Sequence, residues 1–80
     1  RCTIYPNPTS GVFNVQMSQF ENLKMKDIEI YNMYGEKVPA HFQINSSSNS
    51  QIDLSSPPAG IYFIELNTSK GNYHGKVVKE

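Results

Sequence analysis

The stretch IDLSSPPAGIYFIEL, residues 52–66, decides the fold of this chain. Residues 52–54 run apolar, polar, apolar, and Tyr62, Ile64 and Leu66 share one face of a second alternating run. A period of two indicates half-buried strands rather than a helix. The stretch therefore predicts two strands joined by a short crossing rich in serine and proline.

The end of this crossing has the layout of a tyrosine corner. Pro57 and Pro58 stiffen the chain, and Tyr62 lies at the start of the next strand. In a tyrosine corner, a buried ring sends its hydroxyl back to an upstream backbone group. We therefore expect Tyr62 to lie in the core, on a central strand that is the sixth along the chain.

The same period of two continues outward in both directions from this stretch. Strands are expected at residues 2–5, 12–17, 27–32, 38–44, 51–54, 61–66 and 72–79. Seven short strands separated by turn residues are typical of a small immunoglobulin-like antiparallel β-sandwich, an all-β fold. The expected core consists of Phe13, Val15, Ile28, Ile30, Val38, Ile52, Leu54, Tyr62, Ile64 and Leu66. Residues 18–26 are expected to form a loop with at most one helical turn.

Length and charge narrow the class of protein. The 80 residues form one expected domain, 1–80, and the seven basic and seven acidic side chains cancel. This balance argues against a nucleic-acid binder and against a polybasic membrane-docking module. No apolar run is long enough for a membrane span, so direct membrane insertion is not expected. Without an apolar signal core near Arg1, the chain is expected to be a mature domain or part of a longer protein.

No cluster of residues predicts catalysis, a metal site or a cofactor. His41 and His74 lie on different expected strands without ligands at metal spacing, so both are expected at the surface. The single cysteine, Cys2, is expected to be a small apolar residue of the first strand rather than a nucleophile. The acidic residues of the strands, Asp27, Glu29, Asp53 and Glu65, are expected on solvated faces, and the isolated glycines in turns or bulges. The sequence therefore predicts a binding, sorting or structural module and not an enzyme.

Four segments together resemble a known family. They are YPNPTSG at 5–11, IEIYNMYGEKV at 28–38, IDLSSPPAGIYFIEL at 52–66 and GNYHGKVVK at 71–79. Their order and spacing resemble the type A C-terminal sorting domain of the type IX (Por) secretion system, over nearly the whole chain. The resemblance implies a sorting signal that directs a fused upstream cargo protein across the outer membrane of a Gram-negative bacterium, by way of the periplasm. It also implies translocon and sortase partners, cleavage of the domain at the surface, and a cargo that is secreted or held at the cell surface.

The resemblance also assigns motif residues. These are Pro6, Asn7, Pro8 and Gly11 in the opening motif, Gly35 in the central hairpin, Gly60 and Tyr62 in the glycine-x-tyrosine, and Lys76 and Lys79 in the last strand. The chain ends on Glu80, where the family often ends on a basic residue. Among these residues, only the two lysines lack an expected packing role. The last strand is expected to be an accessible edge that a translocon reads through its backbone or its lysines.

A different class of function remains open on the sequence alone. An extracellular β-sandwich accessory module that binds carbohydrate or protein would need an exposed aromatic platform. Tyr31, Tyr34 and Tyr73 could supply such a platform.

Overall fold

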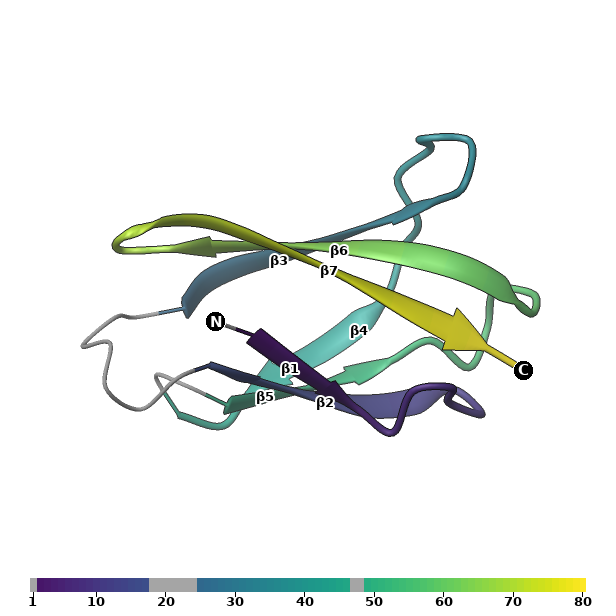
Figure 1. Cartoon of the computed structure of the whole chain (residues 1–80), viewed down its shortest axis with the longest axis horizontal. Helices are drawn as coiled ribbons and strands as arrows, with labels where there is room; N and C mark the ends of the chain where they lie inside the picture. Colours follow the sequence, from purple (N-terminus) through teal and green to yellow (C-terminus); the bar gives the residue numbers. More distant parts are fainter. Residues whose placement is uncertain (1, 18–24, 47–48) are drawn as a thin grey trace.

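A computed structural model of the chain describes residues 2–17, 25–46 and 49–80 and contains two antiparallel sheets packed face to face (Figure 1). The strands are β1 (Cys2–Tyr5), β2 (Val12–Met17), β3 (Met25–Asn32), β4 (His41–Ile44), β5 (Asn49–Asp53), β6 (Gly60–Thr68) and β7 (Gly71–Lys79). The described part of the chain contains no helix, and hence none long enough to cross a membrane. The predicted seven-stranded β-sandwich is confirmed. The loop expected at 18–26 lies outside the described residues up to position 24, and Met25 already belongs to β3.

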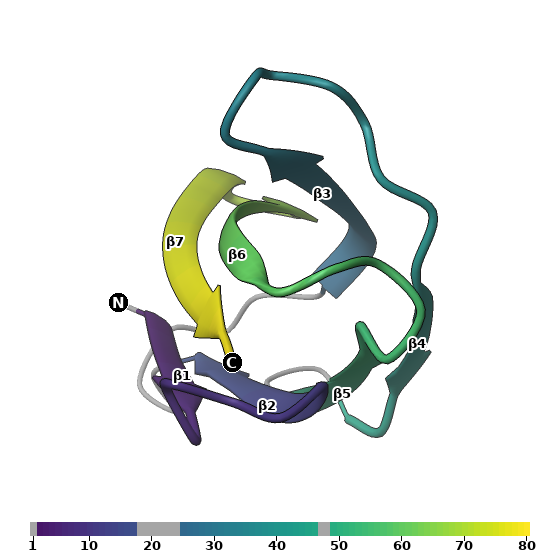
Figure 2. The same cartoon turned by 90° about the vertical axis from the view of Figure 1, so that its right-hand side faces the viewer.

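The two sheets differ in width. One has the order β1-β2-β5-β4 and the other the order β3-β6-β7, so four strands face three. Figure 2 shows the layers end-on, with β4 at the outer edge of the wider sheet. The chain changes sheet between β2 and β3, between β3 and β4, and between β5 and β6. β6, the strand that follows the proline crossing, is the central strand of the narrower sheet, as expected.

Alternating side chains from both inner faces form one core. Its buried apolar members are Phe13, Val15, Met17, Met25, Ile28, Ile30, Ile52, Leu54, Tyr62, Ile64, Leu66 and Val77. Nine of the ten expected core residues are in this set, and the exception is Val38, which is only half-buried. Val38 lies in the connection before β4 and uses its backbone N–H to bond the Ile30 carbonyl at 2.8 Å.

The strand expected at 38–44 is shorter than predicted. Pro39 cannot donate to a ladder, and β4 begins only at His41. Phe42 and Ile44 point to the inner face opposite the buried Ile52 and Ser50, yet they remain 40% and 38% exposed. They stay exposed because the narrower sheet ends at β3 and leaves the inner face of β4 partly uncovered.

The glycines fulfil two kinds of role. Gly35, with φ of 80°, closes the turn after β3, in agreement with the expectation of a turn at this glycine. Gly75 departs from the expectation of a turn or bulge, because it lies inside β7. A Cβ at this position would lie 2.5 Å from Cδ1 of Ile4, so the missing side chain lets β1 approach β7. This close approach brings together β1 and β7, which are edge strands of the two different sheets.

The tyrosine corner is confirmed. Tyr62 is 4% exposed, and its hydroxyl donates to the carbonyl of Pro58, four residues upstream. The ring therefore fills the core while its polar end fixes the proline crossing. The bond ties the β6 end of the β5–β6 connection to the core.

Removing this hydroxyl should weaken the fold. We expect Tyr62→Phe to lose a buried hydrogen bond and about 1–2 kcal/mol of the free energy of unfolding. Tyr62→Ala should also lose the buried ring, at a cost of about 3–5 kcal/mol. Urea denaturation measures both changes, and Tyr34→Phe, at a position 81% exposed, is the matched control. A denaturation midpoint for Tyr62→Phe equal to that of the wild type would contradict the corner.

Candidate functional site

Three segments far apart in the sequence meet at one end of the sandwich. They are residues 6–11 between β1 and β2, residues 55–58 between β5 and β6, and residues 76–80 at the end of β7 (Figure 1). We call this set of residues the terminal clasp. It contains six of the nine motif residues, and hydrogen bonds join its three segments to one another.

Asn7 uses its side chain as a short substitute for a strand. Its amide Nδ2 donates to the carbonyl of Lys76 at 2.9 Å, and its Oδ1 accepts from the N–H of Val78 at 3.0 Å. One side chain thus pairs a donor and an acceptor on the outer edge of β7. The flanking peptide bonds, Tyr5–Pro6 and Asn7–Pro8, are both cis.

Thr9 continues this pairing with its backbone. Its N–H donates to the Val78 carbonyl at 2.8 Å, and its own carbonyl accepts from Glu80 at 2.9 Å. Its side chain is turned inward, where Oγ1 donates to the Val12 carbonyl and accepts from the N–H of Gly11. Thr9 is 1% exposed, so it acts as a buried link between the last strand and the start of β2.

Gly11 connects the clasp to the wider sheet. It is buried, and its carbonyl accepts from the N–H of Leu54 at 2.8 Å. A Cβ on Gly11 would lie 3.0 Å from Oγ of Ser55 and 3.3 Å from its Cα. The motif glycine is therefore needed for the close approach of residues 6–11 to the end of β5.

Lys79 is a structural residue. Its side chain lies on the inner face of β7, is 8% exposed, and donates from Nζ to the carbonyls of Ser55, at 3.0 Å, and Pro57. The expectation that this lysine lacks a packing role is wrong. No sequence pattern around Lys79 indicates this role, because the two carbonyls belong to a loop more than twenty residues upstream. The ammonium holds the proline crossing against the last strand.

The edge of the last strand is also less accessible than expected. Asn7 and Thr9 occupy the outward backbone groups of β7 from Lys76 to Glu80. A translocon therefore cannot pair with this stretch without displacing residues 7–9. Lys76 itself remains exposed, on the outer face beside Phe63 of β6.

The remaining motif glycines differ in their distance from the clasp. Gly60 opens β6 directly after the proline crossing. Gly35 lies in the connection between β3 and β4, and both views place that connection apart from the chain terminus (Figures 1 and 2). The structure thus brings together all the motif residues except Gly35.

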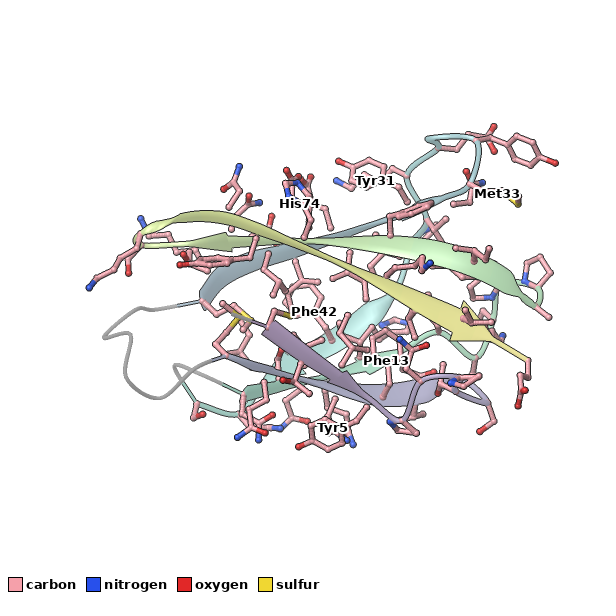
Figure 3. The ribbon with its side chains drawn as sticks, in the orientation of Figure 1. Tyr5, Phe13, Tyr31, Met33, Phe42 and His74 are labelled. Atoms are coloured by element: carbon pink, nitrogen blue, oxygen red, sulfur yellow. The ribbon has the colours of Figure 1, made fainter. Side chains whose placement is uncertain are left out.

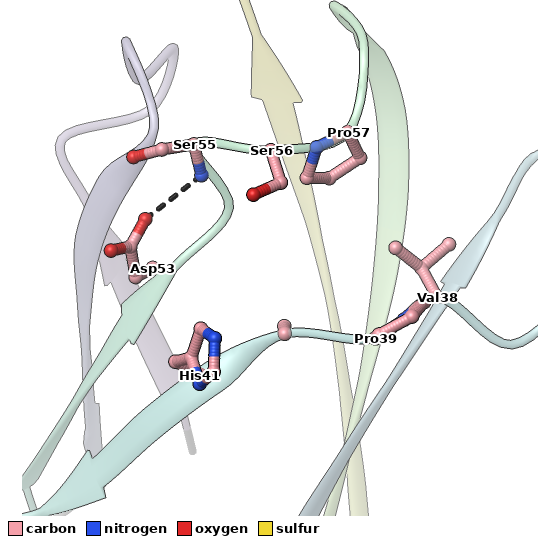
Figure 4. Close-up of a pocket in the computed structure, with 8 residues that line it drawn as sticks. Val38, Pro39, His41, Asp53, Ser55, Ser56 and Pro57 are labelled. Atoms are coloured by element: carbon pink, nitrogen blue, oxygen red, sulfur yellow. Dashed lines mark hydrogen bonds between the residues drawn. The ribbon is translucent and has the colours of Figure 1, made fainter.

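A hollow of about 380 Å³ beside the clasp gathers side chains that could suggest chemistry (Figure 4). It is lined by Val38, Pro39, Ala40, His41, Asp53, Ser55, Ser56 and Pro57. The N–H of Ser55 donates to Oδ1 of Asp53 at 2.8 Å, and hydrogen bonds from the Ser55 hydroxyl and N–H hold the pKa of Asp53 below its usual value. Among the described residues, no hydrogen bond joins His41 to Asp53 or to a serine. A nucleophile paired with a base is therefore not assembled here.

The other titratable residues lie where a solvated surface or the core explains them. His74 is exposed and lies 3.3 Å from the carboxylate of Glu65, and Lys37 pairs with Glu29 at 3.1 Å. Burial raises the pKa of the Cys2 thiol, which keeps it protonated and weakly reactive. Within residues 2–17, 25–46 and 49–80, no three His, Cys, Asp or Glu side chains gather to hold a metal ion.

The three tyrosines of the alternative function do not form one platform. Tyr31 lies on the outer face of β3, and Tyr34 projects from the turn that follows it. Tyr73 lies on the opposite, inner side of β7 and packs against the core. A carbohydrate platform built from these rings is therefore not present.

The stabilising role of the Asn7 hydrogen bonds can be tested by changing one chemical group of its side chain. Asn7→Asp replaces the Nδ2 donor by an oxygen that faces the Lys76 carbonyl, and we expect a loss of about 1 kcal/mol in the free energy of unfolding. The amide of Val78 should exchange with solvent faster. Asn72→Asp introduces the same charge at an exposed position near the other end of β7 and should stay within about 0.5 kcal/mol of the wild type. Equal effects of the two changes would show that Asn7 does not hold the strand.

The two lysines of the last strand should differ in their contribution to stability, because the Lys79 ammonium is bonded within the domain and Lys76 is exposed. Lys79→Met leaves two carbonyls of the proline crossing without their donor, at a cost of about 1–3 kcal/mol. Lys76→Met, three residues away and exposed, should change stability by less than about 0.5 kcal/mol. Chemical denaturation of the two variants measures the difference. A stable Lys79→Met domain would show that the buried ammonium is dispensable.

The comparison with protein families identifies the family of this chain. A family model described as a secretion system C-terminal sorting domain matches residues 3–80, which is essentially the whole chain. A comparison with curated proteins finds no match. The matched family consists of sorting signals of type IX secretion cargo and is not an enzyme family. The chain belongs to the secretion system C-terminal sorting domain family and is a type IX sorting signal.

Proposed function

We propose that the secretion machinery reads the assembled terminal clasp of the folded domain, with Lys76 as its direct contact. The observation that carries this proposal is the pairing of Asn7 with Lys76 and Val78, across 69 and 71 positions of the sequence. The opening motif and the last strand form one surface only when the domain is folded. A reader of this surface would distinguish folded cargo from unfolded cargo.

The motif residues divide into two roles on this proposal. Asn7, Gly11 and Lys79 position the clasp together with the neighbouring Thr9, since their polar groups are used within the domain. Lys76 is exposed on the outer face and offers its ammonium to an acidic surface. An exposed ion pair of this kind contributes at most about 1 kcal/mol, so recognition also needs contacts along the rest of the clasp.

The family supports a proposal for the wider route. The domain would be fused behind a cargo that reaches the periplasm of a Gram-negative bacterium by a separate signal. The translocon would carry the folded protein across the outer membrane, and a surface sortase would remove the domain. The partners would therefore be components of the translocon and the sortase, together with the fused cargo.

An export assay tests whether the secretion machinery contacts Lys76. A reporter that carries a periplasmic signal in front and residues 1–80 behind should appear outside a host with a type IX translocon. Lys76→Glu should lower export several-fold without lowering stability, because it reverses the exposed charge. Lys70→Glu makes the same change in the exposed turn between β6 and β7 and should export normally.

Two further outcomes bear on the proposal. Lys79→Met should lower export in proportion to its loss of folded protein, which denaturation measures independently. If the intact fusion stays in the periplasm while an established sorting domain exports the same reporter, the chain is not a sufficient signal. If Lys76→Glu and Lys70→Glu export equally, Lys76 is not the contact.

A further inference from the structure

The four edge strands of the sandwich are not equally protected. The edge of β7 is covered by Asn7 and Thr9 at its end. The edge of β3 is covered near its end by residues 36–38, through bonds from Val38 to Ile30 and from Asn32 to Glu36. Exposed edges with free backbone groups pair readily with other chains, and proteins usually block them. The edge of β4 has no comparable cover within the described part of the chain.

Two residues of β4, Phe42 and Ile44, have backbone N–H and C=O groups that point away from the sheet. Asn45 donates to the Asn49 carbonyl at 2.9 Å, which marks a hydrogen-bonded pair at the end of the β4–β5 ladder. In an antiparallel ladder such pairs alternate, so Gln43 and His41 also turn their backbone groups toward β5. The N–H and C=O groups of Phe42 and Ile44 consequently face away from the sheet. No other described residue bonds them.

The side chains of these two residues present apolar surface at the same edge. Phe42 and Ile44 are 40% and 38% exposed although both are on the inner face. In the view of Figure 3, Phe42 lies between the two sheets. A hollow of about 230 Å³ lies next to Phe42. Its lining combines apolar residues, among them Ile28, Ile30 and Val38, with the charged residues Asp27, Glu29 and Lys37 of β3 and the connection that follows it. A side chain placed beside Phe42 on the inner face would enter this hollow.

We propose that the free edge of β4 is a strand-addition site for an extended, uncharged segment of a partner protein, with apolar side chains at alternate positions. Outward N–H and C=O groups on alternate residues fit another extended backbone. Incoming residues opposite Phe42 and Ile44 would share their inner face, so these positions should be apolar. The positions between them would lie beside His41 and Gln43, which are exposed, so those should be polar.

A second copy of this chain is a poorer occupant than a partner segment. Only the short run from Phe42 to Ile44 could pair with its symmetry mate. A strand pair of this length buries far less surface than the roughly 1,200 Å² that a stable interface needs. A segment of another protein can add a strand and also fill the hollow under β3. The site does not depend on the export function, and its test uses no secretion assay.

The probe is a capped hexapeptide that alternates valine and threonine, added to the 80-residue chain and followed by NMR. We expect saturable shifts at Phe42 and Ile44 and slower solvent exchange of their two amides. A peptide of the same composition with its three valines contiguous should bind at least tenfold more weakly. Peptides N-methylated on their valines should not bind, because those amides point at β4, whereas N-methylation on the threonines should be tolerated.

A matched pair of protein variants tests the same site. Phe42→Lys places a charge on the inner face of the edge and should weaken peptide binding at least tenfold. Gln43→Lys adds the same charge on the outer face of the same strand and should bind normally. Dichroism and urea denaturation check that both variants fold. If Phe42→Lys does not fold, binding of the N-methylated peptides to the wild-type chain decides the outcome.

Three results would overturn the proposal. The first is a set of shifts that maps to β1, β3 or β7 instead of β4. The second is equal binding of the alternating and contiguous peptides. The third is a free chain that dimerises in sedimentation velocity and becomes monomeric in Phe42→Lys, which would make a second copy the occupant.

Discussion

The pairing of Asn7 with the outer edge of β7 is the interaction on which the ends of this domain depend. An 80-residue sandwich without a disulfide has little stability in reserve, and an unpaired terminal strand would fray. Asn7 and Thr9 give that strand a partner on its second side, while β6 holds the first. Residues 76–79 are thus held on both sides.

Lys79 extends this constraint to the proline crossing. A cation that is nearly excluded from water needs strong acceptors, and the Ser55 and Pro57 carbonyls supply them. Tyr62 bonds the carbonyl that follows directly, that of Pro58. The crossing between the sheets is therefore fixed by two side chains, one from each of two adjacent strands. This explains how a loop rich in serine and proline can form part of a defined surface.

Much of the fold could be predicted because it depends on local patterns. Alternation at residues such as Phe13, Val15, Ile64 and Leu66 reports which face is buried, and the tyrosine corner spans only four residues. The clasp could not be predicted from residues alone. Its contacts join positions about seventy apart, and they depend on one asparagine that no local pattern distinguishes. The family resemblance placed the right segments together in function, but it did not distinguish the buried Lys79 from the exposed Lys76. The exposure of β4 depends on the unequal width of the sheets, and no strand pattern reports that.

The place of the clasp along the chain has a mechanical consequence. Residues 6–11 are separated from any chain attached ahead of Cys2 by β1, which pairs along its whole length with β2. A pull applied through that attached chain acts first on the four residue pairs of this ladder. The bonds of Asn7 and Thr9 carry load only after β1 has peeled away. β1 can therefore work as a sacrificial segment that shields the terminal surface from strain while a tethered protein is moved.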